Sequence, residues 1–155
     1  MTSKISASVV ERSQGLLEPG EQVRRVLLAQ GGINPWAQVV FFMMGLIGVR
    51  AVAVAAGAES GFGSLGGALG GLAGGLIGAA LTSRRVVLMT DRGVVVLEYG
   101  RFGGVKPTRV LARLPLGTAL GTLSGTWAQT ELDGERLWVH KKWHSDAAAF
   151  AGRLG

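Results

Sequence analysis

The chain has 155 residues and a net charge of +6, and 48% of its residues are hydrophobic but only 17% are charged. This length allows one domain with an appendage, and the charged fraction lies below the ~25% typical of soluble domains. The absence of cysteine excludes disulfide scaffolds and cysteine-based metal sites or nucleophiles.

The apolar and basic residues lie in different parts of the chain. The apolar excess lies in residues 36–82, and the basic surplus lies mainly in residues 84–155. A basic surface suits an anionic neighbour, and phospholipid headgroups are the first candidate beside an apolar segment of this length.

The first elements are short. Residues 1–16 are predicted to form an amphipathic helix, which Pro19-Gly20 ends, and they lack the apolar region of a signal peptide. We therefore expect the chain to begin in the cytoplasm. Residues 21–30 can form a strand, and Asn34-Pro35 has the residue types of a helix N-cap and first helical position.

Two apolar stretches follow, residues 36–58 and 61–82, with Glu59 in the short break between them. As a helix the first would be about 35 Å long, which is enough to cross a ~30 Å hydrocarbon core with some tilt. Trp36 suits a membrane interface, and Arg50 is expected either to extend towards the headgroups or to mark a contact with a second copy. The two stretches predict a transmembrane helical hairpin over residues 34–83.

The second stretch has glycines on one helical face and leucines on the other. Small residues at this spacing let a second helix backbone approach closely. The predicted partner is the first helix, on which Ala51 and Ala55 share a face with two of its glycines. The residues predicted to pack the two helices are Gly63, Gly66, Gly67, Gly70, Gly71, Gly74, Gly75, Gly78, Gly45 and Gly48.

The flanking charges predict the orientation. Arg24 and Arg25 precede the hairpin and Arg84, Arg85 and Arg92 follow it. The positive-inside rule places both termini in the cytoplasm, as in a multi-pass protein of the cell inner membrane. The alternative, a flexible glycine-rich insert, does not explain the regular leucine spacing.

From residue 84 the pattern changes to that of strands. Strand-like runs occupy residues 84–90, 92–100, 108–114, 118–125, 126–132 and 135–141, and residues 145–154 are predicted to form a closing helix. Asp133-Gly134 between two such runs is a strong hairpin signal. With residues 21–30, this gives about seven strands and a terminal helix, an α+β arrangement.

Three short motifs in this order resemble bacterial pleckstrin-homology-like (PH-like) domains. The motifs are LEPGE at 17–21, VVLMTDRGVVVL at 86–97 and RVLARLPL at 109–116. The resemblance covers residues 17–30 and 84–155. It implies a seven-strand bent barrel closed by a C-terminal helix, with the transmembrane hairpin inserted between the first two strands. It also implies binding of lipids or proteins and no catalysis.

Other motifs do not predict chemistry. Residues 61–66 match G-x-G-x-x-G, but no strand precedes them, as a dinucleotide site requires. His140, His144 and Asp146 lack the constraint of a metal site, and with Ser145 they are too close in sequence to form a catalytic triad. We therefore expect no cofactor, no metal and no enzymatic activity.

Aromatic and cationic residues alternate over residues 138–144. This pattern suits a headgroup interface, although Trp138 and Trp143 are also candidates for core packing. The residues predicted to contact anionic headgroups are Arg84, Arg85, Arg101, Lys106, Lys141 and Lys142.

The sequence therefore predicts a membrane-held, non-enzymatic binding module for anionic lipid or a protein partner. The alternative is a glycine-zipper hairpin that assembles into an oligomer or pore, with the barrel as a soluble cap. No helix–turn–helix, zinc-finger or RNA-recognition signature supports binding of nucleic acid.

Overall fold

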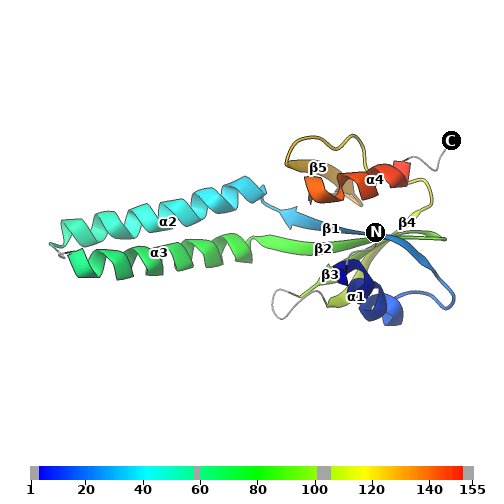
Figure 1. The fold of residues 1–155 in the computed structure, drawn as a ribbon, viewed down its shortest axis with the longest axis horizontal. Coiled ribbons are helices and arrows are strands. Elements are labelled where there is room, and N and C mark those ends of the chain that lie inside the picture. Colours follow the sequence, from blue (N-terminus) through cyan, green and yellow to red (C-terminus); the bar gives the residue numbers. More distant parts are fainter. Residues whose placement is uncertain (1–3, 58–59, 101–105, 152–155) are drawn as a thin grey trace. The chain divides into compact units, whose positions relative to one another are not determined.

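The computed structural model describes residues 4–57, 60–100 and 106–151, and it describes side chains for all of these except 60–67 and 149–151. The helices are α1 (Lys4–Ser13), α2 (Pro35–Ala55), α3 (Ser60–Ala80) and α4 (His144–Ala151), with two short 3₁₀ helices, η1 (Gln14–Leu16) and η2 (Lys141–Trp143). The strands are β1 (Val23–Gly32), β2 (Thr82–Thr90), β3 (Gly93–Tyr99), β4 (Pro107–Pro115), β5 (Trp127–Leu132) and β6 (Glu135–His140) (Figure 1).

The chain divides into two compact units. One is Met1–Gly31 with Ser83–Gly155, which we name the β unit, and the other is Gly32–Thr82, which we name the hairpin unit.

The described strands of the β unit form a six-stranded antiparallel sheet in the order β4-β3-β2-β1-β6-β5. The α+β class and the predicted hairpin at Asp133-Gly134 are confirmed, and Asp91-Arg92 forms the turn between the antiparallel strands β2 and β3. The order places β4 and β5 at opposite edges, so the described strands do not show the closed barrel that the resemblance implies.

The seventh predicted strand, over residues 118–125, is absent. Three glycines in or next to this segment have positive φ. Gly117, just before it, has a φ of 98°, and Gly121 and Gly125, within it, have φ values of 70° and 79°. These conformations interrupt an extended strand. The segment is instead a loop that buries Leu120, whose carbonyl accepts a hydrogen bond of 2.7 Å from the Thr130 hydroxyl.

Both faces of the central strands are buried. On one face Leu27, Val87 and Val96 pack with Trp143 of η2 and Ala147 of α4. On the other face Val26, Leu88 and Leu97 pack with Val9 of α1. Double coverage explains why the central strands read as continuous apolar runs, VVL and VVVL, where a half-exposed sheet would alternate.

The three motifs that resemble those of PH-like domains meet at one end of the sheet. Their charged residues form a cluster there that we name the staple. Arg92, in the β2–β3 turn, donates to the Glu18 carboxylate at 2.9 Å and to the Pro19 carbonyl at 3.2 Å. The same turn exchanges two hydrogen bonds with the segment before β1, from the Gln22 amide to Asp91 at 2.8 Å and from the Asp91 amide to the Gln22 carbonyl at 3.0 Å. These motif residues therefore fix the chain entering β1 to the neighbouring turn.

Glu21 is the buried centre of this staple, with a side chain only 1% exposed. Its carboxylate accepts from the Glu18 amide at 2.9 Å and from the Arg113 guanidinium at 3.0 Å. Burial alone would raise the pKa of Glu21, but the hydrogen bonds from Glu18, Thr90 and Arg113 and the Arg113 charge hold it below the ordinary value of 4.5.

The hairpin unit consists of α2 and α3, which lie side by side (Figure 1). The predicted N-cap is confirmed, because the Asn34 side chain accepts from the Trp36 amide at 2.9 Å and Pro35 is the first helical residue. On α3 the buried glycines face α2, and Leu69, Leu72 and Leu76 are exposed.

The helix backbones approach closely at the glycines. A Cβ built on Gly74 would lie 2.5 Å from the Phe41 carbonyl oxygen, and one on Gly45 would overlap the Gly70 carbonyl oxygen. One built on Gly71 would lie 2.9 Å from a Leu46 methyl group. Larger residues at these three positions would therefore push the helices apart.

The open end of the hairpin is the end where α2 begins and α3 ends. Towards this end the two helices pack less tightly at the glycines. A Cβ on Gly75 would be in ordinary contact with the Phe42 ring, 3.5 Å away, and one on Gly78 would lie 3.5 Å from the Gln38 Cβ. Gly63, Gly66 and Gly67 lie outside the residues whose packing is described.

The contact face of α2 differs from the predicted one. Gly48, Ala51 and Ala55 are exposed, and a Cβ built on Gly48 would meet no described atom within 4 Å. Val49, four residues after Gly45, contacts Gly70 in its place. The α2 residues that meet the α3 glycines, Phe41, Gly45 and Val49, are spaced by four, so the contact face follows i, i+4 and passes beside Gly48.

The hairpin packing predicts a cross-link in this cysteine-free chain. The Cβ separation of 3.5 Å between positions 38 and 78 lies in the range of disulfides. The double variant Gln38→Cys/Gly78→Cys should therefore form an intramolecular disulfide under mild oxidation in neutral detergent, measured as loss of thiol labelling.

Two further substitutions test whether the glycines set this separation. Adding Gly74→Leu should slow the cross-link strongly, because the new side chain would collide with the Phe41 carbonyl. Adding Gly48→Leu, an identical change in open space, should leave the rate unchanged. Equal rates in both triple variants would contradict the observed face.

The staple predicts a dependence of stability on pH. The pKa of Glu21 is near 4.5 in the unfolded chain and lower in the folded one, so its stabilising effect is fully present above pH 4.5 and is lost as pH falls through the folded pKa. At pH 7, Glu21→Gln should lower the free energy of unfolding by about 2 kcal/mol, measured by chemical denaturation of the full chain in neutral detergent.

The difference between Glu21→Gln and the unaltered chain should shrink below pH 4.5. The exposed Glu131, on β5, provides the matched control, because Glu131→Gln should change the free energy of unfolding by less than about 0.5 kcal/mol. A difference for Glu21→Gln that grows on acidification would contradict the assigned direction of the pKa.

Candidate functional site

Arg84 and Arg85, adjacent in sequence, have different surroundings. Arg85 is 11% exposed and pairs with Glu135 at 2.9 Å and with Glu98 at 3.7 Å. Arg84 is exposed, and the ion pairs found among the described residues do not include it. The charge of Arg85 is thus already compensated within the sheet, and Arg84 alone of the two remains a candidate for a ligand.

The other residues predicted to contact headgroups lie on different elements of the β unit. Lys141 and Lys142 are exposed in η2, and the Lys142 ammonium lies 5.5 Å from the centroid of the Trp143 ring. Lys106 is exposed just before the edge strand β4. Arg101 lies outside the described residues.

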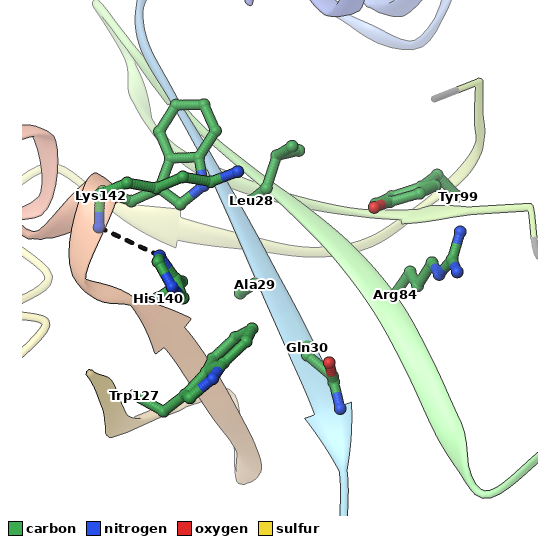
Figure 2. Close-up of a pocket in the computed structure, with 9 residues that line it drawn as sticks. Leu28, Ala29, Gln30, Arg84, Tyr99, Trp127, His140 and Lys142 are labelled. Atoms are coloured by element: carbon green, nitrogen blue, oxygen red, sulfur yellow. Dashed lines mark hydrogen bonds between the residues drawn. The ribbon is translucent and has the colours of Figure 1, made fainter. Parts of the chain in front are cut away.

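Arg84 and Lys142 both line a pocket of about 260 Å³ in the β unit. Its other lining residues come from β1, β3, β5, β6 and η2, and they are Leu28, Ala29, Gln30, Tyr99, Trp127, His140 and Trp143. Figure 2 shows Arg84 and Tyr99 on one side of β1, with His140 and Trp127 on the other.

Several side chains of the pocket lie on the sheet face that α1 partly covers, whereas Trp143, which also lines it, packs on the opposite face. Leu28 and Gln30 alternate with the residues of β1 that face Trp143, so they point to the same side as Val26, which packs with α1. Tyr99 and Leu28 border the α1-covered cluster. Both side chains remain partly exposed there.

The lining of the pocket is basic and contains no Asp or Glu. Burial raises the pKa of the Tyr99 hydroxyl above its ordinary value of 10.0, against the opposing effect of the Arg84 charge. The phenol is therefore neutral at physiological pH and can donate a hydrogen bond.

Two buried N–H donors on this face have no hydrogen-bond partner among the described residues. They are Gln30 Nε2 and Trp138 Nε1. Gln30 and Trp138 are directly opposite in the β1–β6 pair, so their side chains lie on the same face. A buried donor without an acceptor costs about 1–3 kcal/mol, which makes the pair unusual in a folded protein.

The histidines are engaged within the chain. His140 accepts at Nδ1 from the Lys142 amide at 3.3 Å, and its ring meets that of Trp127 edge-on at 4.9 Å (Figure 2). His144 Nε2 lies 3.1 Å from the Val139 carbonyl. Within the described ranges, no three His, Asp or Glu residues are grouped as metal ligands would be.

Of the residues that line the pocket, Arg84 and Lys142 were among the predicted headgroup contacts, and Gln30, Tyr99 and Trp127 were not. Each of these comes from a different strand, and no local motif marks them. Only the strand order, with β1 between β2 and β6, places them around one pocket.

Comparison of the chain with protein-family models, with curated proteins and with solved structures found no match in any of the three. The resemblance to PH-like domains therefore stays a prediction from three short motifs. What can be inferred about function rests on the residues of this chain, above all on the exposed apolar helices and on the basic pocket with its unpartnered donors.

Proposed function

We propose that this chain is a non-enzymatic membrane protein in which α2 and α3 insert as a hairpin and the β unit binds anionic headgroups, or a protein partner, at the cytoplasmic surface. One helix among the described residues, α2 with 21 residues, is long and apolar enough to cross a membrane. For α3 the apolar stretch within the described side chains is 68–80, which is shorter.

The observation that carries this proposal is the exposure of large apolar side chains on both helices. Each such side chain that leaves water contributes about 1.5–3 kcal/mol, so together they strongly favour an apolar environment. Patches of this size mark contact surfaces. The exposed residues are Trp36, Val39, Val40, Phe41, Phe42, Met43, Met44, Ile47, Val52 and Val54 on α2, and Leu69, Leu72, Leu76 and Ile77 on α3.

A bilayer fits the dimensions of this surface. A helix of 21 residues is about 31 Å long, close to the thickness of the hydrocarbon core. Arg50 is exposed near the C-terminal end of α2, where a long cationic side chain can reach the headgroups. Basic residues on both sides of the hairpin favour cytoplasmic ends, as in a multi-pass inner-membrane protein.

The β unit is suited to contact the adjoining headgroups. Arg84, Lys141 and Lys142 are exposed cations, each worth about 1 kcal/mol near an anionic membrane. Gln30 precedes Pro35 by five residues and Arg84 follows Ala80 by four, so chain length alone keeps both within roughly 18 Å of a hairpin end. This reach favours lipid over a distant ligand.

The alternative of assembly through the glycine face has less support. Gly45, Gly70, Gly71 and Gly74 are already in contact with the partner helix of the same chain. On α3 a second copy would meet the exposed leucines, which provide no close backbone approach, so a close contact would have to use the exposed Gly48, Ala51 and Ala55 of α2.

The membrane proposal predicts that the full chain resists alkaline extraction from membranes. Ile47→Asp, at an exposed apolar position of α2, should weaken insertion by about 2.5–3.5 kcal/mol and release more protein into the supernatant. Ile5→Asp on α1 makes the same change outside the hairpin and should have no effect. Release of the unaltered chain would overturn the proposal.

The binding proposal predicts attachment of the β unit to charged vesicles. Residues 33–81 can be replaced by a short flexible linker, because a Cβ on Gly31 would lie only 2.7 Å from the Ser83 hydroxyl, and so the two cut ends are adjacent. Near-ultraviolet circular dichroism would establish that the shortened chain folds.

The folded β unit should sediment with phosphatidylglycerol vesicles at about 50 mM salt and much less at about 500 mM, since salt screens exposed charges. Vesicles of phosphatidylcholine alone serve as the control. A folded β unit that binds both kinds of vesicle equally, or neither, would contradict the lipid role.

A further inference from the structure

We propose that the pocket lined by Gln30, Arg84, Tyr99 and Lys142 is a specific site for one phospholipid phosphate group. The inference rests on the proposed function and deepens it. It assigns binding of the anionic headgroup to one defined pocket and not to the basic surface as a whole. Two observations carry it: the described residues of the lining include two cations and no carboxylate, and the side-chain amide nitrogen of Gln30, which lines the pocket, has no partner among the described residues.

The polar groups are those that a phosphate requires. Arg84 and Lys142 provide positive charge, and Gln30 provides a side-chain amide N–H donor. Tyr99 adds a neutral hydroxyl on the same face. A phosphate has several acceptor oxygens and can satisfy these donors together, whereas a cationic ligand would leave them unpaired and meet repulsion.

The remaining lining indicates an apolar body beside the phosphate. Leu28, Trp127 and Trp143 provide an apolar and aromatic wall, and tryptophan prefers the boundary between headgroups and acyl chains. The volume of about 260 Å³ lies just below the range of sites for whole small molecules. The pocket therefore suits a phosphate and its glycerol linkage and not an entire lipid or a dinucleotide.

The experiment uses the full chain in neutral detergent and a soluble probe, dihexanoyl phosphatidylglycerol. Binding is measured by tryptophan fluorescence, since Trp127 and Trp143 line the pocket, and by calorimetry. Dihexanoyl phosphatidylcholine carries the same acyl chains and phosphate with a compensating positive charge, and inorganic phosphate lacks the apolar body. Saturable binding is expected for phosphatidylglycerol and weaker binding for both other probes.

Gln30→Leu separates the pocket from general surface charge. It removes a donor without changing net charge, and it should raise the Kd for phosphatidylglycerol roughly tenfold, as expected for a lost hydrogen bond to an anion. Because the Gln30 amide nitrogen has no hydrogen-bond partner in the described part of the chain, the variant should unfold at the same temperature or a higher one. Loss of binding together with loss of thermal stability would indicate a structural role and overturn the assignment.

Lys142→Gln and Lys141→Gln form the matched pair. Both remove one exposed charge from η2, but only Lys142 lines the pocket. Lys142→Gln should weaken binding several-fold, and Lys141→Gln should leave it nearly unchanged. If both lysine variants weakened binding of phosphatidylglycerol equally and Gln30→Leu left its Kd unchanged, the pocket assignment would be overturned. The charge-dependent attachment of the β unit to vesicles would not be affected by that result.

The remaining outcomes are also decisive. Inorganic phosphate that binds as tightly as phosphatidylglycerol would overturn the lipid assignment, because the apolar wall would then contribute nothing. Failure of the full chain to bind any probe, when the β unit still attaches to anionic vesicles, would overturn the pocket alone. Failure of both experiments would overturn the proposed function as well.

Discussion

The pairing of β1 with β2 constrains the rest of the molecule. These strands are hydrogen-bonded neighbours, although residues 33–81 separate them in sequence. Neighbouring strands lie about 4.8 Å apart, whereas packed helices are usually 8–10 Å apart. The inserted segment must therefore leave and return at almost one point, and its helices can do so with least distortion if their backbones approach closely. Gly74 provides that approach, and nearer to the strands the Gln38 side chain donates to the Thr82 hydroxyl at 2.5 Å.

Gly32 shows the same constraint at the point where the chain leaves β1. It has a φ of 86°, and a Cβ there would lie 2.5 Å from the Leu81 carbonyl oxygen. Both the backbone conformation and the space restrict this position to glycine. The glycines of this chain therefore serve more than one purpose: in the hairpin they shorten the distance between helices, and at Gly121 and Gly125 they prevent a strand.

The sequence predicted elements better than it predicted what surrounds them. The N-cap at Asn34, the turn at Asp133-Gly134 and the leucine face of α3 follow from local patterns, and the structure contains them. The predicted contact face of α2 differs from the observed one because the positions of glycine and alanine alone do not reveal that Val49 packs against Gly70. The pocket could not be predicted, since Gln30, Tyr99 and Trp127 converge only through strand order and register.

Arg84 and Arg85 show how strand geometry separates two identical residues. Successive side chains of a strand point to opposite faces. Arg85 points to the side of Glu98 and Glu135, and its charge is neutralised by the ion pairs with these two carboxylates. Arg84 points to the face that α1 covers only in part. The staple at Glu21 fixes the segment that joins α1 to β1. It lies where β1 begins and β2 ends, whereas Gln30 and Arg84 lie where β1 ends and β2 begins, so the ion pairs of the staple and the exposed charge of Arg84 occupy opposite ends of the same two strands.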